Sequence, residues 1–403
     1  MRIVVIGVLV IGTLIPAACG EGDSAAEAPE SAPGRLVIVG GALSPDNEAV
    51  YQAVLDGRLG DGPVCVIPTA GGDPAASMAS AVERIDRWGG AATAQGVLVT
   101  VDAPERADDA EVAAQLRGCS GFYFTGGSQS RIVAAFRPDG RATLGYEALI
   151  SRWREGAVVA GSSAGAAMMG GHMISGGASM DAFEVGVGDD PEGVEVTQGM
   201  GFFDQGWLDQ HFLARGRWGR LLMTALRAPP YAVGYGIDEN TALVVDGDRA
   251  TVVGASGVVV INARNAQGDD VVEGITLELL GAGDAIDLQS LEVTPAAGKL
   301  AVEPVPASSA VDLTDPFARW ALLTHLAGLS EADGAGARLD YAFGEGWTLE
   351  LEPASGFRIR RSDPDVEATG PDGPAVGPEG TPLGLGAGPF SVRITVGQPG
   401  SPQ

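Results

Sequence analysis

Short apolar runs alternate with amphipathic stretches from Arg35 onward. Five of these runs are continuous and are each followed by a polar or glycine-rich turn; they cover 36–39, 64–67, 97–100, 121–124 and 157–160. Parallel strands are buried on both faces, so their sequences are continuously apolar rather than alternating. The pattern therefore predicts an α/β fold, a three-layer sandwich with a mostly parallel sheet.

The texture of the chain changes after Gly234. Apolar runs over 241–245, 250–253, 257–261, 275–280 and 285–293 lie close together and predict antiparallel strands that continue the same domain. We therefore expect one main domain over 35–298 and an extension over 299–362, made of a helix near 316–329 and a few short strands. Residues 363–403 form a tail rich in Pro and Gly, a composition that leaves open whether the tail is ordered.

The N-terminal residues have the anatomy of a secretory signal. Arg2 precedes an apolar run over 3–15, which is too short to cross a bilayer, and small residues follow up to Cys19. We expect residues 1–19 to act as a signal, residues 20–34 to form a disordered linker, and the protein to be exported to the periplasm or cell surface. Cys19 resembles the acylated cysteine of a bacterial lipobox, but Pro16 departs from that pattern, so ordinary signal cleavage remains the alternative.

Composition narrows the range of partners. The 403 residues carry a net charge of −27 and contain no basic run, which argues against a nucleic-acid partner. Cys65 and Cys119 lie in no metal-binding spacing, so we expect neither a metal nor a cofactor. Export would permit a disulfide between these two cysteines, but two buried free thiols are an equal alternative.

One segment carries the pattern of a nucleophilic serine. Residues 161–165 read Gly-Ser-Ser-Ala-Gly, which fits G-x-S-x-G, and they stand between an apolar run and a predicted helix. Ser163 is then the nucleophile, and the N–H groups of Ala164 and Gly127 are candidate donors to an oxyanion. The motif alone also fits a tight packing turn, so its partners must decide.

A serine nucleophile needs a base, and the chain has three histidines. His325 lies in a predicted helix and His172 lies in the segment that leaves the serine motif, so His211 is the candidate base by elimination. A carboxylate should orient it. Asp181 and Glu184 lie between the serine and the histidine in sequence, and Asp209 lies next to the histidine but could equally bind substrate.

Three arginines follow His211 at 215, 217 and 220, where a helix is predicted to begin. Cations at a helix N-terminus oppose the helix dipole, so helix stability does not account for them. They predict a cluster that binds carboxylates.

Four segments together resemble the cyanophycinases, which are serine exopeptidases of the dipeptidase E type with a class I glutamine amidotransferase-like fold. The segments are 125–129, 161–166, 209–212 with the three arginines, and 236–242, and the resemblance covers about 35–293. It implies that Ser163 is the nucleophile and His211 the base. The family's third member is a glutamate, and a reading without gaps places Asp181 there, with Glu184 as the alternative.

The resemblance also implies a substrate and a pocket. Cyanophycin is a polyaspartate backbone with arginine on each β-carboxyl, and the family releases β-Asp-Arg dipeptides from it. The residues implied to line the pocket are Gln129, Asp209, Gln210, Arg215, Arg217 and Arg220. The family further suggests a homodimer. Membrane contact is expected only through the lipid that the lipobox-like position of Cys19 would allow.

Two alternatives remain. A dipeptidase of the same fold would act on other aspartyl peptides, whereas a catalytically silent surface lipoprotein would only bind ligands or partners. The hypothesis of a catalytically silent lipoprotein is favoured if Ser163 Oγ and His211 cannot approach hydrogen-bonding distance.

Overall fold

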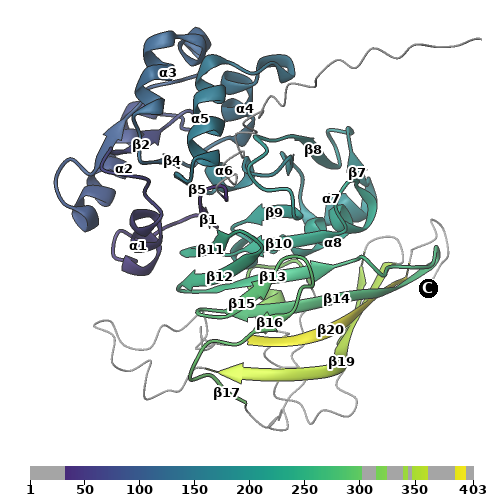
Figure 1. Cartoon of the computed structure of the whole chain (residues 1–403). Helices are drawn as coiled ribbons and strands as arrows, with labels where there is room; N and C mark the ends of the chain where they lie inside the picture. Colours follow the sequence, from purple (N-terminus) through teal and green to yellow (C-terminus); the bar gives the residue numbers. More distant parts are fainter. Residues whose placement is uncertain (1–31, 302–314, 325–338, 344–346, 362–385, 396–403) are drawn as a thin grey trace, which may run out of the picture. The chain divides into compact units, whose positions relative to one another are not determined.

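The computed structural model describes residues 32–301, 315–324, 339–343, 347–361 and 386–395. Two large sheets dominate this part of the chain (Figure 1). The predicted signal, its linker and Cys19 lie outside the described residues. Within the described residues, no helix is long and apolar enough to cross a membrane.

The first sheet has nine strands in the order β16-β15-β12-β11-β1-β5-β4-β2-β3. Its parallel half consists of β1 (Leu36–Val39), β5 (Val158–Ser162), β4 (Gly121–Phe124), β2 (Val64–Ile67) and β3 (Ala94–Gly96). Its antiparallel half consists of β11 (Thr241–Asp246), β12 (Arg249–Gly254), β15 (Ala285–Asp287) and β16 (Val293–Thr294). Residues 97–100 do not form the expected strand. The strand in this region is β3, which ends at Gly96.

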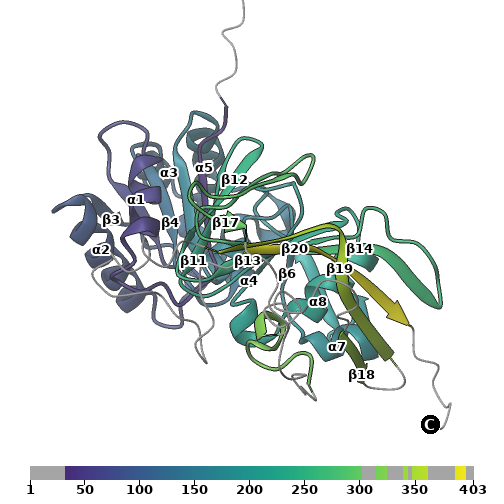
Figure 2. The same cartoon turned by 90° about the horizontal axis from the view of Figure 1, so that it is seen from below.

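Helices cover both faces of the parallel strands, which confirms the predicted three-layer α/β fold. Alternate residues of β1 point to opposite cores: Ile38 packs with the helices on one face and Val37 with those on the other. One face carries α1 (Glu48–Asp56) and α2 (Pro74–Gly89). The other carries α3 (Ala110–Arg117), α4 (Gln129–Phe136) and α5 (Leu144–Arg154) (Figure 2).

The second sheet follows the path β17-β19-β20-β14-β13-β10-β9, with β18 paired to β19. It begins from the parallel pair β9 (Trp207–Gln210) and β10 (Val233–Ile237). The antiparallel strands are β13 (Gly257–Asn262), β14 (Val271–Gly281), β17 (Leu300–Ala301), β18 (Leu339–Phe343), β19 (Trp347–Arg361) and β20 (Gly386–Thr395). A third core packs this sheet against α7 (Ser179–Glu184) and α8 (Trp218–Arg227).

The remaining elements are short. A third sheet contains β6 (His172–Ile174), β8 (Val194–Gln198) and β7 (Val187–Gly188). The one-turn helices are α6 (Ala164–Ala167), η1 (Pro104–Asp108), η2 (Pro138–Gly140) and η3 (Leu213–Arg215).

In two places the C-terminal part differs from the sequence-based expectation or goes beyond it. The helix expected over 316–329 is described only to Thr324 and is helical from Ala321. The tail, whose order the sequence left open, contains β20, which pairs with both β14 and β19 and buries Phe390 and Ile394. The composition of the tail did not indicate this strand, because Pro and Gly dominate the residues before it. The apolar side chains of the strand find packing partners only in the folded sheet.

A disulfide joins Cys65 in β2 to Cys119 after α3. The two cysteines are 54 residues apart in sequence, and both are fully buried. The sequence left pairing and free thiols as equal alternatives, and the structure pairs them. The bond ties the strand to the segment that leads into β4.

We expect the Cys65→Ala/Cys119→Ala double variant to lose about 2–5 kcal/mol of unfolding free energy, since a disulfide that closes a loop restricts the unfolded chain. Denaturant unfolding, followed by circular dichroism, measures this loss. A reductant should destabilise the wild type and leave the double variant unchanged. An unfolding midpoint of the wild type that does not respond to the reductant contradicts the prediction.

Candidate active site

Ser163 lies in a sharp turn between β5 and α6. Its backbone has φ of 58° and ψ of −111°, a conformation that a serine rarely adopts. Gly161 permits the turn, because a Cβ there would lie 2.2 Å from the carbonyl oxygen of Gly165. The strand, strained serine and short helix are the context in which G-x-S-x-G presents a nucleophile.

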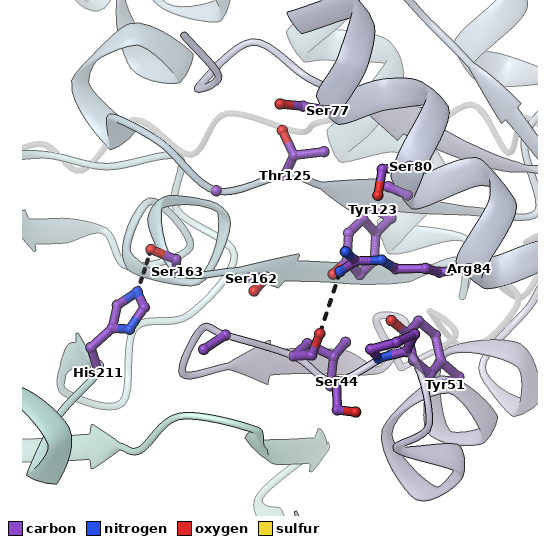
Figure 3. Close-up of a pocket in the computed structure, with 15 residues that line it drawn as sticks. Ser44, Tyr51, Ser77, Ser80, Arg84, Tyr123, Thr125, Ser162, Ser163 and His211 are labelled. Carbon is purple, nitrogen blue, oxygen red and sulfur yellow. Dashed lines mark hydrogen bonds between the residues drawn. The ribbon is translucent and has the colours of Figure 1, made fainter. Parts of the chain in front are cut away.

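Ser163, His211 and Glu239 form a continuous hydrogen-bonded relay. His211 Nε2 lies 2.8 Å from Ser163 Oγ, and His211 Nδ1 lies 2.6 Å from Glu239 Oε1 (Figure 3 shows the serine–histidine contact). The side chain of His211 is 8% exposed and that of Glu239 is 25% exposed. A carboxylate on Nδ1 fixes the tautomer whose Nε2 accepts the serine proton. The distance condition that would have favoured a silent lipoprotein is therefore not met.

Asp181 does not reach His211, and its predicted place in the triad is wrong. It lies in the first turn of α7, where its Oδ2 accepts a hydrogen bond of 2.7 Å from the N–H of Ala178. Glu184 ends the same helix and is exposed. Both carboxylates are close to Ser163 in sequence only.

Two glycines at the end of β1 position the imidazole. The N–H of His211 donates a 2.6 Å hydrogen bond to the carbonyl of Gly40, and His211 has φ of 51°. Gly41 must lack a side chain, because a Cβ there would lie 2.3 Å from His211 Cε1, and its own φ is 109°. The imidazole ring is thus packed against the backbone of Gly41, and its two nitrogens are held by the hydrogen bonds to Ser163 and Glu239.

Opposing effects act on the pKa of His211, and the result lies below the ordinary value for histidine. Burial lowers it most, the hydrogen bond and charge of Glu239 raise it, and the positive charges of Arg215 and Arg217 lower it further. The free site therefore holds a neutral imidazole near pH 7. That is the form that can accept a proton from Ser163.

Asp209 and Arg220, both implied to contact substrate, are buried against each other. Arg220 Nε donates to Asp209 Oδ2 at 2.7 Å, its Nη2 donates to Oδ1, and its Nη1 donates to the carbonyl of Gly177 at 2.7 Å. Asp209 is 2% exposed and Arg220 is 5% exposed. The two residues therefore support the loop around them rather than line a cleft.

Arg217 and Arg215 lie closer to the surface. Arg217 Nη1 donates to the backbone and side-chain oxygens of Gln210 and lies 3.6 Å from Asp209 Oδ1. Burial is the main cause that lowers the pKa of Arg217 to about 10, so it keeps its charge at pH 7. Arg215 is exposed. Gln129 is buried, and its side-chain amide donates to the carbonyl of Ile174. Of the six residues implied to line the pocket, Arg215 and Arg217 thus remain candidates for substrate contact.

The C-terminal extension holds the loop that carries these arginines. Trp218 Nε1 donates to the carbonyl of Pro316 at 2.7 Å, and the N–H of Trp320 donates to the carbonyl of Leu213 at 2.8 Å. Phe317 packs on the ring of Trp218. The segment 315–324 therefore acts as a brace for residues 213–218.

A cleft with a cavity volume of about 610 Å³ opens at Ser163, on the side of the helices α1 and α2 (Figure 3). Its polar lining beyond the serine and histidine includes Ser44, Tyr51, Ser77, Ser80, Arg84 and Tyr123. Among the described residues that line it, none belongs to the six that the resemblance implied. Sequence patterns did not indicate this cleft, because its wall comes from helices far from the serine motif in sequence.

The predicted oxyanion donors stay a prediction. Ala164 follows Ser163 at the start of α6, as expected. Gly126, which precedes Gly127, lies against the serine, since a Cβ on Gly126 would be 3.3 Å from Ser163 Cβ. Among the described residues, no group of three or more His, Cys, Asp or Glu side chains is arranged to hold a metal ion.

A strained serine in hydrogen-bond contact with a histidine, on an α/β sandwich, defines a serine hydrolase. The sequence model of peptidase family S51 matches residues 36–253, and the chain belongs to that family. The family resemblance expected from the sequence is therefore confirmed.

Several known proteins are similar to this chain. A cyanophycinase of Trichormus variabilis is 29% identical over 289 residues, which cover 68% of this chain and 91% of the relative. A cyanophycinase of Synechococcus elongatus is 30% identical over 273 residues, which cover 64% of this chain and 81% of the relative. A solved peptidase from an acI-B1 Actinobacterium is 22% identical, covers 63% of this chain and 97% of its own, and superposes with a TM-score of 0.45.

The sequence contained an indication of Glu239, but the comparison with the family pattern without gaps, which started from Ser163, did not reach it. Glu239 stands two residues after the apolar run Val233–Ile237, in a segment that already carried part of the family resemblance. In the parallel pair of β10 and β9, Ile237 lies beside Gln210. Residues just past these two strand ends, Glu239 and His211, are therefore neighbours.

We expect Glu239→Gln to lower kcat by about three to four orders of magnitude, as loss of the orienting carboxylate does in serine triads. Asp181→Asn should change kcat less than about twofold and leave stability almost unchanged, because the amide oxygen of Asn can still accept the hydrogen bond from the N–H of Ala178. Peptidase assays and thermal unfolding of both variants measure these effects. A strong loss of activity in Asp181→Asn with an active Glu239→Gln would contradict the relay.

The pH dependence offers a second test. Activity should fall as pH drops through the pKa of His211, because the imidazolium cannot accept the serine proton. Arg215→Gln removes a positive charge that disfavours the imidazolium, so the pKa of His211 rises and the acid limb of kcat/KM moves to higher pH.

The midpoint of that limb, not its height, is the measurement. The control is Arg141→Gln, which removes an exposed arginine paired with Asp108. Added salt should shrink the shift, since Arg215 is exposed. An acid limb that stays in place or moves to lower pH would show that Arg215 does not act on His211.

Proposed function

We propose that this peptidase hydrolyses cyanophycin and releases β-Asp-Arg dipeptides through an acyl-enzyme. The observation that carries the proposal is the relay of Ser163, His211 and Glu239 in a chain of family S51 that is similar to cyanophycinases. The alignment with the Trichormus variabilis relative covers 91% of that protein, so the shared region is not confined to the serine motif.

The relay assigns each group a step. Ser163 Oγ attacks the scissile carbonyl carbon while His211 Nε2 takes its proton, and Glu239 stabilises the imidazolium through Nδ1–H. His211 then gives the proton to the leaving amine, which separates from the acyl-enzyme ester. Water attacks the ester with His211 again as base, and Ser163 regains its proton.

The positive charges of Arg215 and Arg217 support a substrate that carries free carboxylate groups. In a chain with a net charge of −27, they place cationic side chains close enough to His211 to affect its pKa. Each unit of cyanophycin carries the free carboxylate of its arginine, which these guanidinium groups can bind. Arg217 is already oriented by Gln210.

Export, a lipid on Cys19 and a homodimer stay predictions. The signal and Cys19 lie in residues 1–31, outside the described part of the chain. The disulfide of Cys65 and Cys119 supports export, because such bonds persist in oxidising compartments.

The purified protein without residues 1–19 should solubilise cyanophycin granules and release β-Asp-Arg, detected by mass spectrometry. Ser163→Ala should abolish release, since loss of a triad serine costs on the order of 10⁶ in kcat in another serine peptidase. Activity on other aspartyl dipeptides with no release from cyanophycin would sink the substrate and keep the serine mechanism.

A further inference from the structure

The cleft at Ser163 contains one charged side chain besides the groups of the relay, that of Arg84. Arg84 lies on α2 and points into the cleft in Figure 3, across from Ser44. Its Nη1 makes a long hydrogen bond of 3.4 Å to the carbonyl of Leu43. Among the described residues, no carboxylate lies within ion-pair distance of this guanidinium.

The next arginine of the same helix shows the contrast. Arg87, three residues further along α2, is exposed and pairs with Asp46 at 2.6 Å. Arg58 and Arg137 are also half-buried without a carboxylate partner among the described residues, but each donates a 2.8 Å hydrogen bond to a backbone carbonyl, whereas the hydrogen bond of Arg84 is 3.4 Å long. Arg84 is therefore better explained by a ligand in the cleft than by the fold.

Polar groups with unused hydrogen-bonding capacity line the same cleft. The buried hydroxyl oxygen of Thr125 makes no hydrogen bond with the described residues, and the buried hydroxyl of Tyr51 lies beside the guanidinium of Arg84. Burial raises the pKa of the hydroxyls of Tyr51 and Tyr123, and the positive charge of Arg84 opposes that rise, so the guanidinium lies near both rings. Buried hydroxyls left without partners cost free energy unless a ligand satisfies them.

A planar guanidinium beside hydroxyl donors fits a carboxylate, which can accept both fork hydrogen bonds and a further one from an O–H. We propose that Arg84, with the hydroxyls of Tyr51 and Thr125, forms a carboxylate-binding subsite for the peptide unit next to the one that is released. This subsite is separate from Arg215 and Arg217, which do not line the cleft. The proposal rests on the proposed function, because each cyanophycin unit supplies one such carboxylate.

The test compares Arg84→Gln with the control Arg87→Gln on two synthetic substrates. One is a two-unit β-Asp-Arg oligomer, and the other has the arginine carboxylate of the retained unit converted to a carboxamide. We expect Arg84→Gln to lower kcat/KM for the carboxylate substrate about 10- to 100-fold, mainly through KM, as for a lost charge-assisted hydrogen-bond pair. For the wild type, kcat/KM should be lower on the amide substrate than on the carboxylate substrate by a similar factor. For Arg84→Gln, kcat/KM should be almost the same on both substrates, because the substitution and the amide remove the same interaction.

Two results overturn the subsite: an Arg84→Gln enzyme equal to Arg87→Gln, or the same loss on both substrates. If the wild type cleaves neither oligomer, the proposed function fails and the subsite is tested by labelling of Ser163. Two peptidyl fluorophosphonates that differ only in a terminal carboxylate or carboxamide serve as probes. Faster labelling by the carboxylate probe that depends on Arg84 supports the subsite, and labelling independent of Arg84 overturns it.

Discussion

The close packing of the His211 ring on the glycines that end β1 is the constraint on which the site depends. Gly40 accepts the N–H of His211, and the N–H of Asn240, directly after Glu239, donates to the carbonyl of Gly41. The N–H of Ser163 donates to Val39, the last residue of β1. All three members of the relay are thus tied to one strand end, which holds the ends of two different sheets within hydrogen-bonding distance.

Charge is divided between support and surface around this relay. The ion pair of Asp209 and Arg220 is buried, and its main effect is to position the start of α8. Arg217 lies beside this pair and is held by its hydrogen bond to Gln210. A buried pair of this kind contributes little net stability over an apolar pair of the same size, whereas breaking it is costly. The cations left to act on a ligand are Arg215, which is exposed, and Arg217, which lies at the edge of the buried pair rather than inside it.

The extension beyond residue 298 belongs to the same structure as the site. Its strands β19 and β20 continue the sheet that starts with β9, the strand that ends just before His211. Residues 315–324 brace the arginine loop through Trp218. The family match ends at residue 253, so this brace comes from a part of the chain that the family pattern does not describe.

The sequence by itself determined the parallel α/β core, the serine motif and the histidine, because each depends on local periodicity or on residue scarcity. Only the tertiary structure decided the partners of those residues. Glu239 replaces Asp181 because parallel pairing of β10 with β9 brings it to His211, while Asp181 is used by its own helix. The cleft with Arg84 likewise arises where α2 packs over the sheet, and such packing distances are not written in the spacing of residues along a chain.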